Sequence, residues 1–157
     1  MQFDPKWSGL TNAVVFAQLE DWSKRAEEGI KYYSGKATYR KTFDLSALPN
    51  EKTTWQKCKI YLDLASVSVM AGVRLNDRDL GIVWCAPWRV AVPADLLKEK
   101  GNRLEVTVAN LWSNRLIGDS ALPVEKRLAW TTHNPFKAGA ELQPSGLFGP
   151  VKLMEEE

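Results

Sequence analysis

The sequence VSVMAGVRL, at residues 67–75, decides the fold of this chain. Its apolar side chains recur at every second position, while the other positions are mostly small or polar. A period of two places the apolar set on one face of an antiparallel strand whose other face meets solvent. Residues 103–108 repeat the scheme, with Leu104, Val106 and Val108 on the inward face.

Further short runs also have the composition of strands. These runs are residues 37–43, 58–64, 80–84, 88–92 and a closing run near 149–153. The connections are short: Asn76 and Asp77 both tolerate the left-handed backbone of a tight hairpin, and residues 93–97 fit one helical turn at most. Several strands without alternating helices predict an all-β, antiparallel β-sandwich. No repeat or linker divides the chain, so a single domain over residues 1–157 is expected.

Composition narrows the class of protein. The chain has 157 residues, of which 45% are hydrophobic and 25% charged, which is typical of a globular domain. The net charge is only +2 and both signs alternate along the chain, which disfavours nucleic acid. No apolar stretch approaches the roughly 20 residues that span a bilayer. The start of the chain has no signal-peptide pattern, and this fits either a cytosolic protein or an excised part of a longer, exported one.

Two smaller features allow simple interpretations. Cys58 and Cys85 are too few for a disulfide framework, so either one bridge or two buried thiols is expected. The acidic run at residues 155–157 is interpreted as a solvated tail.

The chain has seven tryptophans, and several lie beside turn residues. Trp84 and Trp88 bracket the turn at residues 85–87. An indole ring presents a large apolar face with a hydrogen-bond donor at its edge, so a ring on a loop is suited to stacking on a sugar. Tryptophan is also highly buried on average, so packing remains the alternative for each ring, those of Trp7, Trp22 and Trp55 included.

Between residues 111 and 149 the strand pattern lapses. A run of this length inside a domain indicates a functional loop or an element that the pattern fails to show. It holds polar and aromatic candidates for ligand contact: Trp112, Asn114, Arg115, Asp119, Trp130, His133 and Asn134. Two interpretations of Arg115 remain open, a pair with Asp119 four residues on and donation to sugar hydroxyls.

Catalysis and metal binding find little support in the sequence. Glycoside hydrolysis needs two carboxylates about 5–9.5 Å apart, and neither Asp119 nor Glu125 has a visible partner. His133 is the only histidine, and zinc needs several nitrogen or thiolate ligands at defined spacing. His133 is expected to be a hydrogen-bonding loop residue, with ligand contact as the alternative.

The strand segments resemble the sugar-binding jelly-roll domain of glycoside hydrolase family 2, within the galactose-binding-like superfamily. They are residues 39–43, 73–76 with 80–81, 95–97, and 102–110. The flanking segments are similar to the C-terminal β-sandwich of enzymes related to the family 106 α-L-rhamnosidases. They are residues 111–119, 130–136 and 144–151. The resemblance extends from Phe3 to Leu153, with two departures. The usual Asn-Gly turn is here Asn76–Asp77, and the chain has no room for the separate, much larger catalytic domain of such enzymes.

The resemblance implies a galactose-binding-like jelly roll that serves as a non-catalytic accessory domain of a bacterial glycoside hydrolase. Its partners would be a plant-type poly- or oligosaccharide and the catalytic domain of the parent enzyme, without nucleic acid or membrane. The residues expected to bind the glycan are Trp84, Trp88, Trp112, Asn114, Arg115, Asp119, Trp130, His133 and Asn134. The alternative is a structural domain that packs on the catalytic domain without binding sugar.

The resemblance also implies a compartment and a metal. The parent enzyme would be secreted or periplasmic. No cofactor is expected other than a structural Ca²⁺, which domains of this superfamily often hold, although no dense acidic loop marks a site for it.

Overall fold

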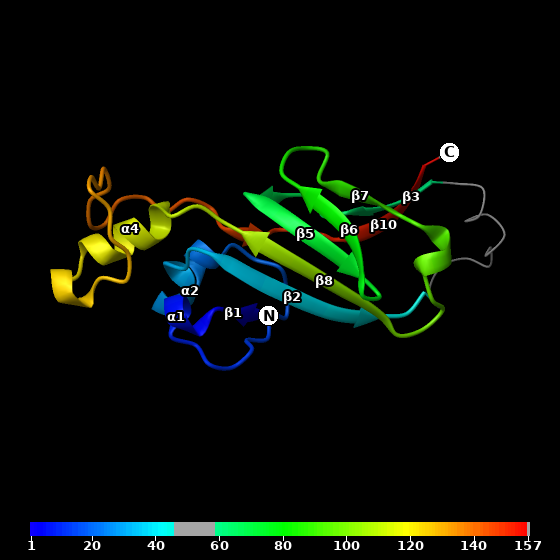
Figure 1. Ribbon diagram of the computed structural model, residues 1–157, viewed down its shortest axis with the longest axis horizontal. Coiled ribbons are helices and arrows are strands. Elements are labelled where there is room, and N and C mark those ends of the chain that lie inside the picture. Colours follow the sequence, from blue (N-terminus) through cyan, green and yellow to red (C-terminus); the bar gives the residue numbers. More distant parts are fainter. Residues whose placement is uncertain (46–58, 157) are drawn as a thin grey trace.

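In a computed structural model, which describes residues 1–45 and 59–156, the chain folds as two main antiparallel sheets with a separate helical end (Figure 1). The five-stranded sheet has the order β1 (Gln2–Phe3), β2 (Lys36–Phe43), β8 (Asn102–Ala109), β5 (Met70–Leu75) and β6 (Arg78–Val83). The three-stranded sheet has the order β10 (Lys152–Glu156), β3 (Lys59–Asp63) and β7 (Arg89–Val92). A short pair joins β4 (Val67–Ser68) to β9 (Gly146–Leu147). The predicted antiparallel β-sandwich is thereby confirmed.

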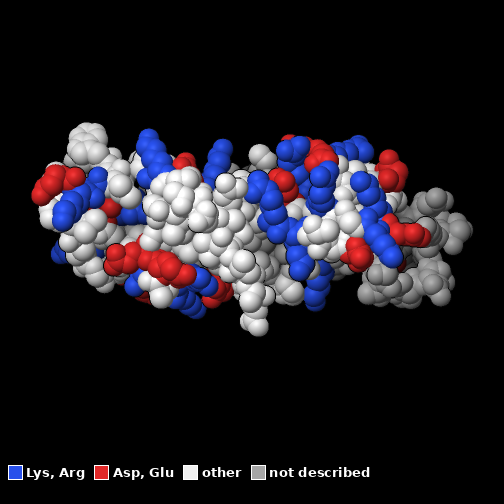
Figure 2. Space-filling model, turned by 90° about the horizontal axis from the view of Figure 1, so that it is seen from below, with Lys and Arg blue, Asp and Glu red and all other residues white. Residues whose placement is uncertain are grey.

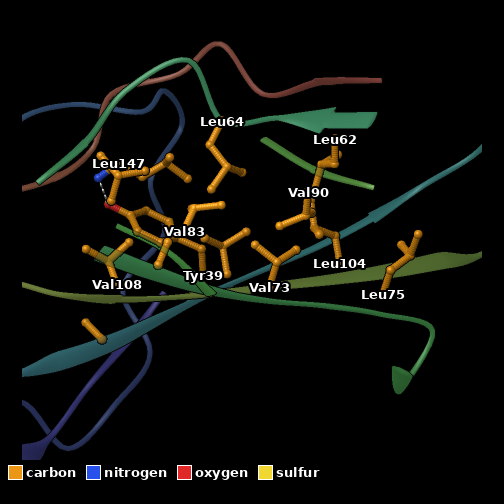
Figure 3. Close-up of a cluster of buried hydrophobic side chains, with 14 of the residues drawn as sticks. Tyr39, Leu62, Leu64, Val73, Leu75, Val83, Val90, Leu104, Val108 and Leu147 are labelled. Carbon is orange, nitrogen blue, oxygen red and sulfur yellow. Dashed lines mark hydrogen bonds between the residues drawn. The ribbon is translucent and has the colours of Figure 1, made fainter. Parts of the chain in front are cut away.

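The two main sheets face each other across one apolar core. Figure 3 shows Leu62 and Val90 from the three-stranded sheet pointing toward Val73 and Leu104 from the five-stranded sheet. Alternate residues of β5 and β8 are buried, as the period of two predicts. The alternation of apolar residues in the sequence therefore predicts which residues of these two strands form the core.

Aromatic rings extend this core toward the helical end. Trp22 is fully buried, and its indole Nε1 donates a hydrogen bond of 2.6 Å to the Tyr39 hydroxyl. The same hydroxyl accepts a bond from the backbone amide of Leu147 at 3.3 Å. Burial raises the pKa of the Tyr39 phenol above its ordinary value. For Trp22, packing is therefore the correct interpretation.

One hairpin turn agrees with the expectation, whereas two strands differ from it in detail. The Asn76–Asp77 hairpin has φ values of 48° and 69°, which confirms the left-handed backbone without a glycine. The expected strand at residues 67–75 is divided into β4 and β5, because β4 pairs with β9 while β5 joins the five-stranded sheet. The closing strand is β10, so Glu155 and Glu156 are exposed strand residues and their interpretation as a tail is wrong.

The helical elements are short. They are α1 (Pro5–Ser8), η1 (Trp22–Lys24), α2 (Glu28–Lys31), η2 (Ala94–Leu96), α4 (Ser113–Ser120) and η3 (Val124–Lys126). The single turn expected at residues 93–97 is η2, whereas α4 was not predicted. Cys85 is exposed in the β6–β7 turn, so the expectation of a buried thiol is wrong there, and Cys58 and Trp55 lie outside the described residues.

Charges of opposite sign are mixed on the sheet surface. On the face drawn in Figure 2, Lys and Arg gather over the half of the molecule that carries the sheets, with Asp and Glu among them. Cross-strand pairs join Arg40 to Glu105 at 3.2 Å and Arg103 to Asp77. These pairs are exposed, so each contributes little to stability.

Candidate functional site

Residues 111–145 form an arm that extends beyond the sheets at one end of the molecule (Figure 1). The arm leaves β8, continues through α4 and η3, and returns to the sandwich at Ser145, where the carbonyl of that residue accepts a bond from Trp22 N at 2.9 Å. It contains every predicted ligand residue apart from Trp84 and Trp88. The part of the sequence in which the strand pattern lapses therefore corresponds to the arm, and it contains the unpredicted helix α4.

Asn114 ties the two limbs of the arm together. Its side chain is buried and donates through Nδ2 to the carbonyl of Gln143 at 2.7 Å and to Ser145 Oγ at 3.1 Å. Its Oδ1 accepts from the amide of Gln143 at 2.8 Å. These bonds occupy both the nitrogen and the oxygen of the side-chain amide. Asn114 therefore stabilises the arm.

Asp119 and Arg115 form a second buried tie. Asp119 Oδ2 accepts from the backbone amides of Leu128 at 3.0 Å and Ala129 at 2.7 Å. Arg115 Nη1 lies 3.6 Å from Asp119 Oδ1, and Arg115 Nη2 donates to the carbonyl of Trp7 at 2.8 Å. This geometry confirms the pairing interpretation of Arg115. It also links the arm to the N-terminal segment.

Asn134 and Ser120 complete the network. Asn134 Nδ2 donates to Ser120 Oγ at 2.9 Å and to the carbonyl of Leu116 at 3.3 Å, while its Oδ1 accepts from Phe136 N at 3.0 Å. Ser120 Oγ in turn donates to the Leu116 carbonyl at 2.7 Å. Unlike Asn114, Asn134 is exposed, so its edge remains open to solvent.

The two tryptophans of the arm are exposed, in contrast to the buried members of this network. The exposed fractions of Trp112 and Trp130 are 64% and 79%, and His133 is exposed as well. Since the polar ties fix the backbone from which these rings project, the arm presents them with little conformational freedom to lose on binding. Asn114, Arg115 and Asp119 are buried, so among the predicted ligand residues of the arm only Trp112, Trp130, His133 and Asn134 are exposed.

Trp84 and Trp88 lie on a different surface. They flank the β6–β7 turn, which Figure 1 shows well apart from α4. Trp84 is 69% exposed, whereas Trp88 is partly buried against the core. The structure therefore does not bring them together with the arm residues.

Several contributors to the arm were missed in the sequence. Ser34 Oγ accepts from the amide of Arg115 at 3.3 Å and donates to the carbonyl of Leu111 at 2.8 Å. Ser145 Oγ accepts bonds from both Asn110 and Asn114. These partners are distant along the chain, and no local pattern signals them.

The acidic side chains of the arm are Asp119, Glu125 and Glu141. Asp119 accepts bonds from two backbone amides and pairs with Arg115, whereas Glu125 on η3 and Glu141 are exposed. Across residues 1–45 and 59–156, no group of three or more His, Cys, Asp or Glu side chains is arranged to hold a metal ion. Within the same residues, no helix has the length and apolarity to cross a membrane.

Comparison with known proteins places the chain inside larger relatives. No family model matches it. It is 39% identical to a putative beta-glucuronidase from Formosa agariphila over 90% of its own length, but it spans only 14% of that protein. It is 40% identical to a rhamnosidase from Novosphingobium sp. PP1Y, with a TM-score of 0.77, over 90% of its length and 13% of that chain.

A third likeness concerns the fold alone. A beta-glucuronidase from Ruminococcus gnavus shares 22% identity with a TM-score of 0.51, over 69% of the chain and 19% of that protein. Taken with the two closer matches, the chain is homologous to one small β-sandwich domain within large glycosidases.

Proposed function

We propose that this chain is a non-catalytic accessory domain of a glycoside hydrolase and that its arm binds glycan through Trp112 and Trp130. In this proposal His133 and Asn134 supply polar contacts at the edge of the two rings. The single observation that carries it is the exposure of both indoles on a backbone that Asn114 and Asp119 hold rigid.

The chemistry of the exposed surface supports a sugar ligand. An indole face stacks on the apolar carbon–hydrogen face of a pyranose, and histidine and amide side chains exchange hydrogen bonds with hydroxyls. Such a surface buries few atoms of each sugar and competes with water for every hydroxyl. We therefore expect dissociation constants between about 1 mM and 1 μM.

The relatives suggest the class of glycan and the setting. Similarity to a rhamnosidase supports a plant-type poly- or oligosaccharide that contains rhamnose, and it agrees with the resemblance to the family 106 enzymes. In the proposal, the chain acts as part of a secreted or periplasmic parent enzyme and leaves hydrolysis to a separate catalytic domain. The chain spans only 14% and 13% of the two relatives, which supports this division of roles.

Titration of the purified chain with rhamnose-containing oligosaccharides, followed by tryptophan fluorescence, tests the proposal. We expect saturable binding that W112A and W130A each weaken at least about fivefold. W84A is the matched control, because Trp84 is similarly exposed on a different surface. Binding that W84A weakens while W112A and W130A leave it unchanged would place the site elsewhere. Failure of every glycan to bind would favour the structural alternative.

A further inference from the structure

The far end of the arm carries exposed aliphatic side chains that the proposed glycan site does not use. We define the arm tip as Leu122, Val124 and Leu128, whose exposed fractions are 39%, 71% and 47%. Aliphatic side chains have no group that exchanges hydrogen bonds with sugar hydroxyls. A cluster of them within seven positions of sequence at the extremity of a domain is the composition of a packing surface.

The backbone of the tip is fixed in place. Asp119 Oδ2 holds the amide of Leu128, and Arg127 Nε donates to the carbonyl of Leu122 at 3.0 Å. The amide of Lys126 also donates to the carbonyl of Pro123 at 3.0 Å, as in a helical turn. The tip therefore presents its side chains in one arrangement, which reduces the entropy lost when a partner covers them.

We infer that the arm tip docks onto the remainder of the glycosidase polypeptide to which this domain belongs, an inference that rests on the proposed function. The two closer relatives extend far beyond the matched segment, which makes up 14% and 13% of them. A domain in such a chain is tethered to its neighbours, so a small contact suffices because the tether raises the effective concentration. Interfaces between domains of one chain commonly bury about 600–1,500 Å².

The chemistry of the tip describes its partner surface. The tip would enter an apolar depression, and the charged residues of the intervening η3 segment, Glu125 and Lys126, would remain at its rim. Trp130, two residues beyond the tip, stays on the limb that returns to the sandwich. The docking surface and the glycan surface are thereby adjacent but separate.

Hydrogen exchange tests the docking. The amides of residues 121–128 are compared between the isolated chain and the polypeptide encoded by its complete gene. We expect exchange at least about tenfold slower in the complete polypeptide, and the triple variant L122S/V124S/L128S should abolish the difference. Val15→Ser is the matched control, because Val15 is an exposed aliphatic residue outside the arm.

The outcomes distinguish docking from glycan binding. Equal exchange in the isolated chain and the complete polypeptide would overturn the inference while leaving the fluorescence titration of Trp112 and Trp130 unaffected. Protection that appears in the isolated chain as its concentration rises would assign the tip to a second copy and would also overturn the inference. Loss of glycan binding in the isolated triple variant would show that the two surfaces are not separate.

Discussion

The carboxylate of Asp119 holds the backbone amide of Ala129 at 2.7 Å, ten positions further along the chain. Through the amide of Leu128 and the guanidinium of Arg115, the same side chain connects α4 to the returning limb of the arm. The shape of the arm therefore depends in part on a buried charge.

Removal of this charge should destabilise the arm. Asp119→Ala leaves Arg115 buried without its carboxylate and frees two amides, so we expect a loss of about 3–5 kcal/mol in the free energy of unfolding. Asp119→Asn retains an oxygen for both amides and should cost less than the alanine variant. Urea unfolding measures both values. A wild-type stability for Asp119→Ala would contradict the role given to the pair.

The close approach of Gly146 to Trp22 gives a second prediction. A Cβ at Gly146 would lie 2.5 Å from Trp22 Nε1, and the φ of +109° is one that side-chain-bearing residues rarely adopt. Gly146→Ala should therefore cost more than about 4 kcal/mol or prevent folding. At Gly72 an added Cβ meets nothing within 4 Å, so Gly72→Ala should change stability by less than about 1 kcal/mol. Thermal unfolding of the two variants separates a specific clash from a general intolerance of substitution.

Tyr39 gives a prediction for alkaline pH. Burial raises the pKa of its phenol in the folded state, so the unfolded chain ionises first as the pH rises. The stabilisation from this group is complete below the ordinary tyrosine pKa near 10 and is lost between that value and the higher folded-state pKa. Chemical denaturation at pH 9, 10 and 11 should show stability falling above pH 10.

The variant Tyr39→Phe isolates this contribution. It removes the ionising group but leaves the indole N–H of Trp22 and the amide of Leu147 without their acceptor. We expect a loss of about 1–3 kcal/mol at neutral pH together with a shallower decline above pH 10. An unchanged alkaline slope would assign that slope to other groups, such as Tyr33, whose pKa burial also raises.

The sheets could be predicted because their signal is local. In β5 and β8 the burial of alternate residues is written into consecutive positions, and Asn76–Asp77 identified the hairpin between β5 and β6. The division of residues 67–75 could not be predicted in this way, because it arises from the pairing of Val67 with Leu147, 80 positions away.

The position of the arm could be predicted from the sequence, but its helix and its hydrogen bonds could not. α4 buries Asn114, Arg115 and Asp119 along with Leu116 and Ile117, so its buried face lacks the apolar periodicity that predicts a helix. Its polar residues were assigned to ligand binding because surface loops commonly carry function. Their partners, such as Gln143 and Ser145, are known only once the chain is folded.

The most direct test of the central claim uses the indole N–H resonances of the chain in a ¹⁵N-correlated NMR titration with a rhamnose-containing oligosaccharide. We predict that the Trp112 and Trp130 signals move in a saturable manner, while the Trp22 signal stays in place because its N–H is bonded to Tyr39 in the core. A spectrum in which the two arm signals remain fixed at millimolar glycan would contradict the claim.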